Sequence, residues 1–452
     1  MLTVDENLYF DPERLLLISG KVVDTEGLEV EIRNKFEDIF REDLSSADCL
    51  FQNKSFQEVD YNMMFPVSGG ICLSDACQLR CNYCAFASDN SNDKKVVSYS
   101  DAEIFIDYLV GNCIIRRFHN RKKDYVLDLY LAGGGEPTFD WNLLYQVTEM
   151  VKEKCRKHNL EYTLGITTNG ILNELQIKYI AENFDVIAVS FDGLPEIQNQ
   201  NRKLLGEEDT FAYVDRTIRK MGEFGKKIIL RSTVWPRDYN RLLDMVRFVY
   251  GNYKNIDTWG IEPINARGRA VEQATGTINQ SFVDYYIEVQ NYIMEQGYDN
   301  ILVCGKFKDN LSGYSCGTVF GLHPWLLTDG RIVTCLDAKE KAAVVAEIKN
   351  GVLTKYKFRD NLAYCYMQAR NNCKSCFAYK FCGAGCPIKY TNEIEIDSMK
   401  CECEMTREYW RYIFKELINH KNVFEWTAKC YKLDSNPELS LFQIWRKTWE
   451  LK

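Results

Sequence analysis

The chain of 452 residues is predicted to be an α/β protein, a partial (β/α)6 TIM-like barrel with a C-terminal Cys-rich domain. Between residues 67 and 262, six apolar runs rich in β-branched and aromatic residues alternate with segments of helical periodicity. This alternation favours a parallel sheet with right-handed crossovers. Six units are fewer than the eight of a closed barrel, so the sheet is expected to be curved and open.

The predicted strands are residues 70–73, 126–132, 162–167, 186–191, 227–234 and 258–262. The predicted helices are residues 101–117, 143–158, 174–182, 210–224 and 239–250, and Ser100 with Glu103 forms a capping box for the first of them. Functional groups of such sheets lie at the carboxyl ends of the strands, where the polar and Gly-rich segments of this chain also fall.

Composition excludes several classes of function. The net charge is -8 and basic residues are scattered, which argues against nucleic-acid and membrane partners. The N-terminus has no signal-peptide pattern and no stretch reaches the length of a membrane span, so a cytoplasmic location is expected. Disulfides are disfavoured there, and 18 cysteines beside only four histidines therefore indicate iron-sulfur clusters or a thiolate zinc site.

Three of these cysteines, Cys77, Cys81 and Cys84, are spaced C-x3-C-x2-C after the first predicted strand. A zinc site or unrelated buried thiols are alternatives for such short spacings. With Tyr83 before the third Cys, the spacing resembles the signature of the radical S-adenosylmethionine (SAM) superfamily. The resemblance implies a 4Fe-4S cluster with one iron open to SAM, which is cleaved to a 5'-deoxyadenosyl radical.

Residues 133–138 follow the second predicted strand and contain three consecutive glycines. A glycine run alone can be an ordinary tight turn, since glycine permits unusual backbone conformations and close approach. In this position the run resembles the GGEP motif of the superfamily, whose backbone contacts the SAM amine. The resemblance assigns that contact to Gly134, Gly135 and Glu136.

Polar residues also follow the third and fourth predicted strands. Thr168 and Asn169 begin a turn, whereas Ser190, Asp192 and the downstream Arg202 resemble the S-x-D-G and Arg pattern of radical SAM peptide modifiers. Arginine pairs with carboxylates in a forked geometry. The resemblance therefore implies that these residues hold the ribose or methionyl end of SAM, and capping or turn roles are the alternative.

Beyond residue 295 the cysteine spacing is C-x13-G-x4-C, a gap, C-x2-C-x5-C-x3-C and a further Cys pair. This spacing resembles the SPASM extension of the superfamily and implies two auxiliary 4Fe-4S clusters; a zinc ribbon is the alternative for the central four. The first cluster would take Cys316, Cys335, Cys386 and, if it is a ligand, Cys304. The second would take Cys373, Cys376, Cys382 and one of Cys401 or Cys403.

Four regions are expected: an N-terminal extension (1–65), the radical SAM barrel (66–294), the SPASM domain (295–405) and a C-terminal helical segment (406–452). The extension contains a possible strand at 8–10 and a helix at 28–40. It is interpreted either as a partial leader-binding element or as a packing extension.

The first hypothesis for function is oxidative maturation of a ribosomally made precursor peptide, by cross-linking or side-chain oxidation, with flavodoxin or ferredoxin as reductant. The second is an anaerobic sulfatase maturase, which forms formylglycine; such enzymes generally place an Asp directly after the Cys equivalent to Cys335, where this chain has Leu336 and then Asp337. Asp337 is the candidate catalytic base. A non-catalytic iron-sulfur electron carrier is the alternative outside the enzyme class.

Overall fold

The structure is a computed structural model. It describes residues 2–5, 8–11, 16–19, 58–60, 65–88, 95–119, 125–265, 267–270, 281–298, 302–307, 318, 323–337, 343–359, 373, 375–382, 385–386, 388–389 and 395–419. The predicted helix at 28–40 and Cys316 lie outside these residues. The chain forms two compact units, described separately here. The barrel unit contains residues 58–277 and 317–362, and the terminal unit contains residues 1–57, 278–316 and 363–452.

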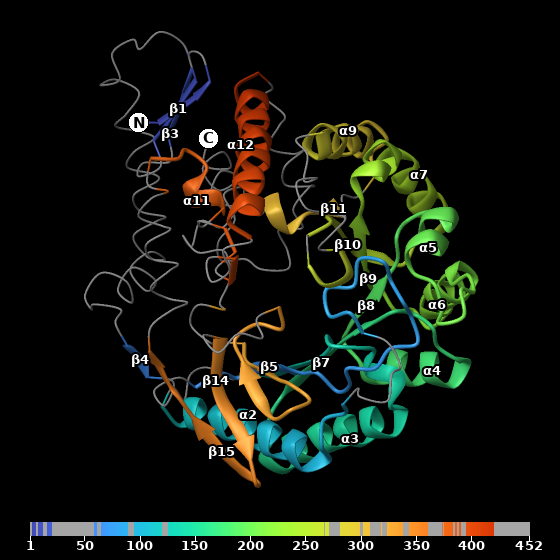
Figure 1. Cartoon of the computed structure of the whole chain (residues 1–452), viewed down its shortest axis with the longest axis vertical. Coiled ribbons are helices and arrows are strands. Elements are labelled where there is room, and N and C mark those ends of the chain that lie inside the picture. Colours follow the sequence, from blue (N-terminus) through green and yellow to red (C-terminus); the bar gives the residue numbers. More distant parts are fainter. Residues whose placement is uncertain are drawn as a thin grey trace. The chain divides into compact units, whose positions relative to one another are not determined.

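Six parallel strands form the centre of the barrel unit, as predicted (Figure 1). Neighbouring strands follow chain order, and the first and last do not pair with each other, so the barrel is open. The strands are β5 (Ser68–Ile71), β6 (Leu127–Leu131), β7 (Tyr162–Thr168), β8 (Val186–Ser190), β9 (Ile228–Val234) and β10 (Ile256–Pro263).

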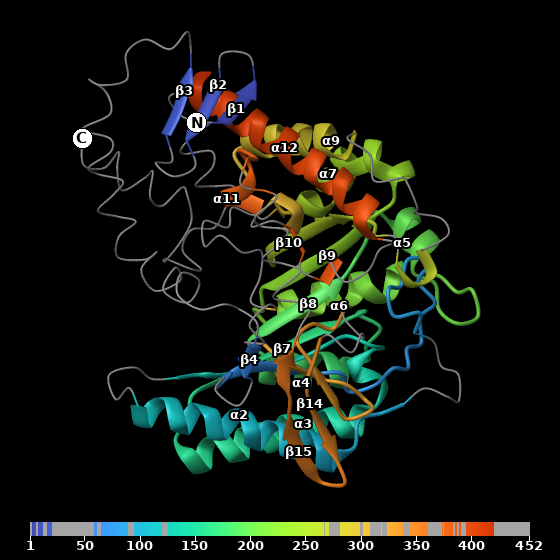
Figure 2. The same cartoon turned by 60° about the vertical axis from the view of Figure 1, so that its left-hand side comes forward.

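Helices follow the strands and lie along the outside of the curved sheet (Figures 1 and 2). They are α2 (Tyr99–His119), α3 (Trp141–His158), α4 (Glu174–Asn183), α5 (Pro195–Asn201), α6 (Phe211–Glu223) and α7 (Leu242–Asn252). Short 3-10 helices occur at η2 (Pro137–Phe139), η3 (Pro236–Arg241) and η4 (Gly268–Ala270). The short, polar α5 was not predicted.

The start of α2 corrects one detail of the sequence analysis. The helix begins at Tyr99, so Ser100 lies in its first turn, and Ser98 Oγ accepts the backbone N–H of Asp101 at 3.0 Å. Ser98 is thus the residue that caps the helix. A capping box is present instead on α4, where Asn173 and Gln176 exchange side-chain and backbone hydrogen bonds.

The sheet continues beyond β5 on the side away from β6. β12 (Trp325–Leu326) pairs parallel with β5, and β13 (Arg331–Val333), β14 (Val344–Lys349) and β15 (Val352–Lys355) follow antiparallel. β4 (Glu58–Asp60) and β16 (Lys357–Arg359) form a separate pair. Because β12 aligns with β5, the turn after β12 lies beside the residues that follow β5.

The terminal unit contains a three-stranded antiparallel sheet of β1 (Leu2–Asp5), β2 (Leu8–Asp11) and β3 (Leu16–Ser19), which includes the strand predicted at 8–10. Its other elements are β11 (Leu302–Val303), α9 (Ser281–Glu295), η5 (Gly305–Phe307), α11 (Tyr379–Cys382) and α12 (Glu395–Asn419).

Stacked aromatic rings fill the core of the terminal unit. The ring centroids of Phe307 and Tyr409 are 4.4 Å apart, and both side chains are fully buried. The aromatic residues of α12 after Cys403 therefore pack as part of a core. Among the described residues, no helix is long and apolar enough to cross a membrane.

Candidate cofactor site

The three-Cys loop, residues 77–84, follows β5 at the carboxyl end of the parallel sheet. Its backbone is held by the end of α5 and the residues just after it: Arg80 N donates to Lys203 O and Asn82 N donates to Asn201 O, both at 2.9 Å. The Asn82 and Asn201 side chains are also hydrogen-bonded, at 3.1 Å. Contacts from a distant part of the chain therefore set the shape of this loop.

The thiols of the loop lie in an environment that disfavours a bare thiolate. Burial, followed by the charge of Glu136, raises the pKa of Cys77 to about 12. Burial also raises the pKa of Cys81, against the nearby charge of Arg202, and the Cys84 thiol adds to this rise. In the part of the chain that the structure describes, no three His, Cys, Asp or Glu side chains are already gathered for a metal ion. The donor set, three soft thiols in one loop, nevertheless fits an iron-sulfur cluster, whose iron would stabilise the thiolates.

The predicted glycine motif packs directly against the segment that leads into this loop. Gly135 N donates to Ser74 O at 2.7 Å. A Cβ atom on Gly135 would lie 1.9 Å from Ala76 O, and one on Gly134 would lie 2.2 Å from Cys72 Sγ. Glycine is therefore required at both positions by close backbone packing.

Glu136 joins the ends of β6 and β7. Its buried carboxylate accepts hydrogen bonds from Thr168 Oγ1 (2.8 Å), Asn169 N (2.7 Å) and Thr138 Oγ1 (2.8 Å). Burial raises the pKa of Glu136, although these donors oppose the rise. Asn169 Nδ2 in turn donates to Cys77 Sγ at 3.6 Å. Glu136, Thr168 and Asn169 thus form one network that ends on a predicted cluster ligand.

A second buried network lies beyond β8. Tyr83 Oη donates to the Asp192 carboxylate at 2.7 Å, and Arg202 Nη1 donates to Tyr83 Oη at 2.9 Å. Asn201 Nδ2 also donates to Asp192, at 3.2 Å. Arg202 is only 8% exposed, and its Nε has no hydrogen-bond partner. A buried guanidinium with an unused donor fits an anionic ligand group such as the carboxylate of SAM. Ser190 ends β8 and is half-buried.

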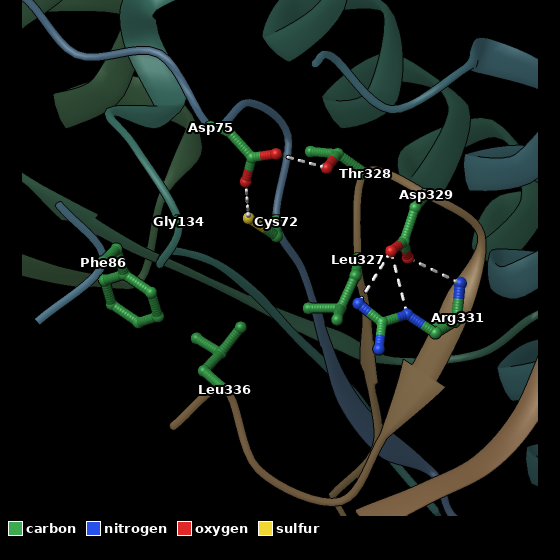
Figure 3. A pocket seen from close by; sticks show the side chains of 9 residues that line it. All are labelled: Cys72, Asp75, Phe86, Gly134, Leu327, Thr328, Asp329, Arg331 and Leu336. Atoms are coloured by element: carbon green, nitrogen blue, oxygen red, sulfur yellow. Dashed lines mark hydrogen bonds and ion pairs between the residues drawn. The ribbon is translucent and has the colours of Figure 1, made fainter. Parts of the chain in front are cut away.

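A small pocket with a volume of about 50 Å³ lies beside Gly134 (Figure 3). Asp75 accepts a hydrogen bond from Thr328 Oγ1 at 2.6 Å on one wall, and Asp329 pairs with Arg331 at 2.7 Å on another. The lining residues are Cys72, Asp75, Phe86, Gly134, Leu327, Thr328, Asp329, Arg331 and Leu336.

Asp337, the predicted base, does not line this pocket. It is half-exposed and pairs with Arg267 at 3.5 Å. Leu336 takes the place beside the glycine loop, where a Cβ atom on Gly133 would lie 2.3 Å from Leu336 Cδ1. The residue directly after Cys335 thus presents an apolar side chain to the pocket.

The sequence model of the Radical SAM superfamily matches residues 71–249, which run from β5 into α7. Residues 71–249 form a radical SAM domain. The open parallel barrel and the loop spacing agree with this assignment.

Curated relatives of the chain share one description. Two cysteine-type anaerobic sulfatase-maturating enzymes from strains of Clostridium perfringens are 24% and 25% identical to it, each over 77% of this chain and 96% of the relative. One from Clostridium novyi is 26% identical over 33% of this chain and 39% of its own. These relatives overturn the first hypothesis for function: the prediction of a maturase for ribosomally made peptides is wrong, and the second hypothesis is favoured.

Solved structures agree in fold. Native anSMEcpe with bound AdoMet has a TM-score of 0.60 at 18% identity, over 78% of this chain and 98% of that one. Native anSMEcpe with bound AdoMet and Cp18Cys peptide has a TM-score of 0.59 at 19% identity, over 78% and 98%. At sequence identities of 18% and 19%, the structural similarity establishes a shared fold.

In the terminal unit, three of the predicted cluster ligands lie within electrostatic reach of one another. Burial, followed by the charges of Cys403 and Cys376, raises the pKa of Cys373 to about 11. Side chains two residues apart on a helix do not face the same side, so Cys401 and Cys403 on α12 cannot both face this pair. The structure does not describe the Cys401 side chain.

The remaining predicted ligands are divided between the two units. Cys335 follows β13 in the barrel unit and is half-buried. Cys304, Cys382 and Cys386 belong to the terminal unit, where Cys304 is buried and the other two are half-buried.

Sequence reasoning missed two contributors to the site. Arg269 donates hydrogen bonds to the three-Cys loop, and Ser88 Oγ donates to Gly134 O. The only sequence signal for Arg269 is its place shortly after the sixth parallel strand. For Ser88 the signal is its nearness to Cys84.

Proposed function

We propose that this radical SAM enzyme is an anaerobic sulfatase maturase, which oxidises a Cys or Ser side chain of a sulfatase polypeptide to formylglycine. The observation that carries the proposal is the match to curated sulfatase-maturating enzymes over 77% of this chain and 96% of theirs. The match extends well beyond the radical SAM domain, into the region of the C-terminal cysteines. A polypeptide partner is also supported by the related anSMEcpe structure with bound Cp18Cys peptide.

Cys77, Cys81 and Cys84 would hold a 4Fe-4S cluster, and SAM would bind between the glycine motif and Arg202. Together these groups supply, when bound, a 5'-deoxyadenosyl radical that abstracts hydrogen. The residues of the chain itself hold the groups that bind the cluster and SAM in position. Glu136 and Asn169 orient Cys77, while Tyr83 and Asp192 fix the Arg202 guanidinium through hydrogen bonds.

Oxidation of a Cys side chain to formylglycine removes two electrons and two protons, releases the sulfur as hydrogen sulfide and takes the aldehyde oxygen from water. One hydrogen atom would leave to the SAM-derived radical, and the remaining electron and proton need acceptors. Two auxiliary 4Fe-4S clusters are proposed as the electron acceptors. Flavodoxin or ferredoxin would supply the electron that starts the reaction.

For the auxiliary cluster of the terminal unit we propose Cys373, Cys376, Cys382 and Cys403 as ligands, because the thiols of the first, second and fourth lie within electrostatic reach of one another. Cys304, Cys316, Cys335 and Cys386 are proposed as the ligands of the other cluster.

Asp337 is proposed as the proton acceptor, one position later than in the sulfatase maturases that the sequence resembles. The pairing of Asp337 with Arg267 fixes its side chain while leaving it half-exposed. Leu336, which occupies the usual position, has no group that could accept a proton.

The test is an anaerobic reaction of the reconstituted protein with SAM, a reductant and matched peptides from the modification site of a sulfatase, one with Cys and one with Ser at the target position. Formylglycine lowers the peptide mass by about 18 units from Cys or about two from Ser. A peptide with Ala at the target position is the control. Formation of 5'-deoxyadenosine with no change in any peptide would reject the substrate. If cluster-loaded protein forms no 5'-deoxyadenosine, the alternative of a non-catalytic iron-sulfur electron carrier would be favoured.

A further inference from the structure

A second set of contacts holds the three-Cys loop from the side of β10. Arg269, in η4, donates three hydrogen bonds to backbone carbonyls. Its own backbone N–H reaches Cys84 O at 3.1 Å and its Nη1 reaches Cys81 O at 3.1 Å, while its Nη2 donates to Ser88 O. Two of these carbonyls belong to predicted cluster ligands, so Arg269 contacts both ends of the C-x2-C half of the loop, Cys81 through its guanidinium and Cys84 through its backbone N–H.

The approach of η4 to the loop is built into the backbone. Gly268 has a φ of +53°, and a Cβ atom there would lie 2.1 Å from Cys84 O. Only glycine allows the chain to pass this close in this conformation. Ala270 then packs in a buried cluster with Trp235 and Ile264, against which the Tyr83 ring lies. The residues directly before and after Arg269, Gly268 and Ala270, therefore fix its position.

Arg269 also places a permanent positive charge beside the loop. Its charge acts on the Cys81 thiol in the direction of a lower pKa, with Arg202, against the larger effect of burial. Arginine stays protonated in proteins, so this charge is present at every working pH. Ser88, whose carbonyl Arg269 holds, donates through its Oγ to Gly134 O and so connects the same contact to the glycine motif.

We propose that Arg269 is a positioning residue that sets the reduction potential of the cluster bound by Cys77, Cys81 and Cys84. This inference rests on the proposed function, in which the three-Cys loop binds a 4Fe-4S cluster. A cluster gains negative charge when it is reduced, so a fixed cation beside it stabilises the reduced form. The forked guanidinium also holds the carbonyls of Cys81 and Ser88 in one orientation, which a lysine cannot do with both at once.

The experiment compares full-length, anaerobically reconstituted wild-type protein with Arg269→Gln and Arg269→Lys. Electron paramagnetic resonance during a redox titration gives the midpoint potential of the cluster whose signal changes when SAM is added, which distinguishes it from other clusters. Iron content and thermal unfolding of the apoproteins are measured in parallel. Arg219→Gln is the matched control, because it removes one positive charge from α6, where Arg219 pairs with Asp215 and makes no described contact with the loop.

For Arg269→Gln we expect about a tenfold fall in the ratio of reduced to oxidised cluster at the wild-type midpoint, which is about 59 mV for a one-electron couple. Arg269→Lys should stay nearer the wild-type potential because it keeps the charge, and Arg219→Gln should not move it. An unchanged potential in Arg269→Gln, or an equal shift in Arg269→Lys, overturns the proposal. Loss of iron together with an unfolded apoprotein in both variants would mean a structural role only, and also overturns it. If wild-type protein has no SAM-responsive cluster, the proposed function itself fails.

Discussion

The two cysteine regions of this protein are held in different ways. The three-Cys loop is fixed by contacts with residues more than 100 positions away in sequence, such as the backbone bond from Asn82 to Asn201 and the bonds from Arg269. In the segment from Cys373 to Lys389, each described backbone hydrogen bond joins residues three or four apart. The described backbone hydrogen bonds of the first region thus reach distant parts of the chain, and those of the second form local turns, although the Lys389 side chain also pairs with Glu402 on α12.

This difference has a thermodynamic consequence. A loop held by distant parts of a packed barrel keeps its shape without metal, because its hydrogen bonds form when the barrel folds. A segment whose backbone bonds are local is expected to depend more on the proposed cluster to bring its ligands together, which would couple metal binding to folding there.

The largest effect is expected from replacing Cys77, Cys81 and Cys84 together by Ala. SAM cleavage should be abolished and about four irons lost per chain. The apoprotein should still unfold cooperatively. Its unfolding free energy should differ from that of wild-type apoprotein by no more than about 1 kcal/mol per substituted site, since the loop is held through its backbone. Chromatography of 5'-deoxyadenosine and thermal unfolding measure the two effects. A variant apoprotein that no longer folds would show that the thiols themselves hold the loop.

In the terminal unit, Cys403→Ala and Cys401→Ala form a matched pair on α12. Cys403→Ala should lower the iron content by about four per chain, because in the proposed cluster Cys403 is the fourth thiolate, whereas Cys401→Ala should leave it unchanged. Iron analysis after identical reconstitution decides between them. The opposite result would assign the ligand to Cys401.

Glu136→Gln tests one of the distant contacts that support the three-Cys loop. The amide can accept hydrogen bonds only through its single oxygen, so one of the donors that now reach the carboxylate loses its acceptor. We expect a loss of about 2 kcal/mol in the unfolding free energy of the apoprotein, measured with denaturant. Glu223→Gln, at an exposed ion pair on α6, is the control and should cost under about 0.5 kcal/mol. Equal effects of the two would argue against a supporting role for Glu136.

The smallest effect concerns the amino end of β5, away from the loop. His323 contacts Ser68 Oγ at 2.6 Å, and burial lowers its pKa from 6.5 to about 4. Between these values the unfolded chain binds more protons than the folded chain, so stability should rise with pH across this window. The expected gain is about 1 kcal/mol, less than the full shift implies because the ring is partly exposed. His323→Gln should flatten this part of the stability profile, and an unchanged profile would show that His323 does not cause it.

The sequence predicted what local patterns encode. Strand and helix periodicity located the six parallel strands, and cysteine spacing located the radical SAM domain. Features that depend on tertiary contact escaped prediction: α2 is capped by Ser98 rather than Ser100, because the chain enters the helix earlier than the apolar pattern begins. Arg269 escaped because its partners lie more than 180 residues away.

Residue types in the motifs indicated which side chains lie near the site, but not which contacts each of them makes. Tyr83, Asp192 and Arg202 do lie together, but the hydrogen bonds among them are internal ones that residue types alone do not define. The substrate was the larger error, since no short motif in this chain encodes the polypeptide it acts on. Relatives that match along most of the chain carried that information instead.

The pairing of β12 with β5 has a consequence for how this protein can be divided. β5 leads directly into the three-Cys loop, and with β6 on one side and β12 on the other it is an interior strand. A chain cut after the sixth parallel strand would leave β5 at the edge of the sheet, with its backbone groups open to pairing with other chains. Such a fragment is expected to self-associate and so is not the smallest soluble unit, and the matched residues 71–249, which contain only the last residue of β5 and none of β10, are shorter still. That unit must include β12 and the three strands after it.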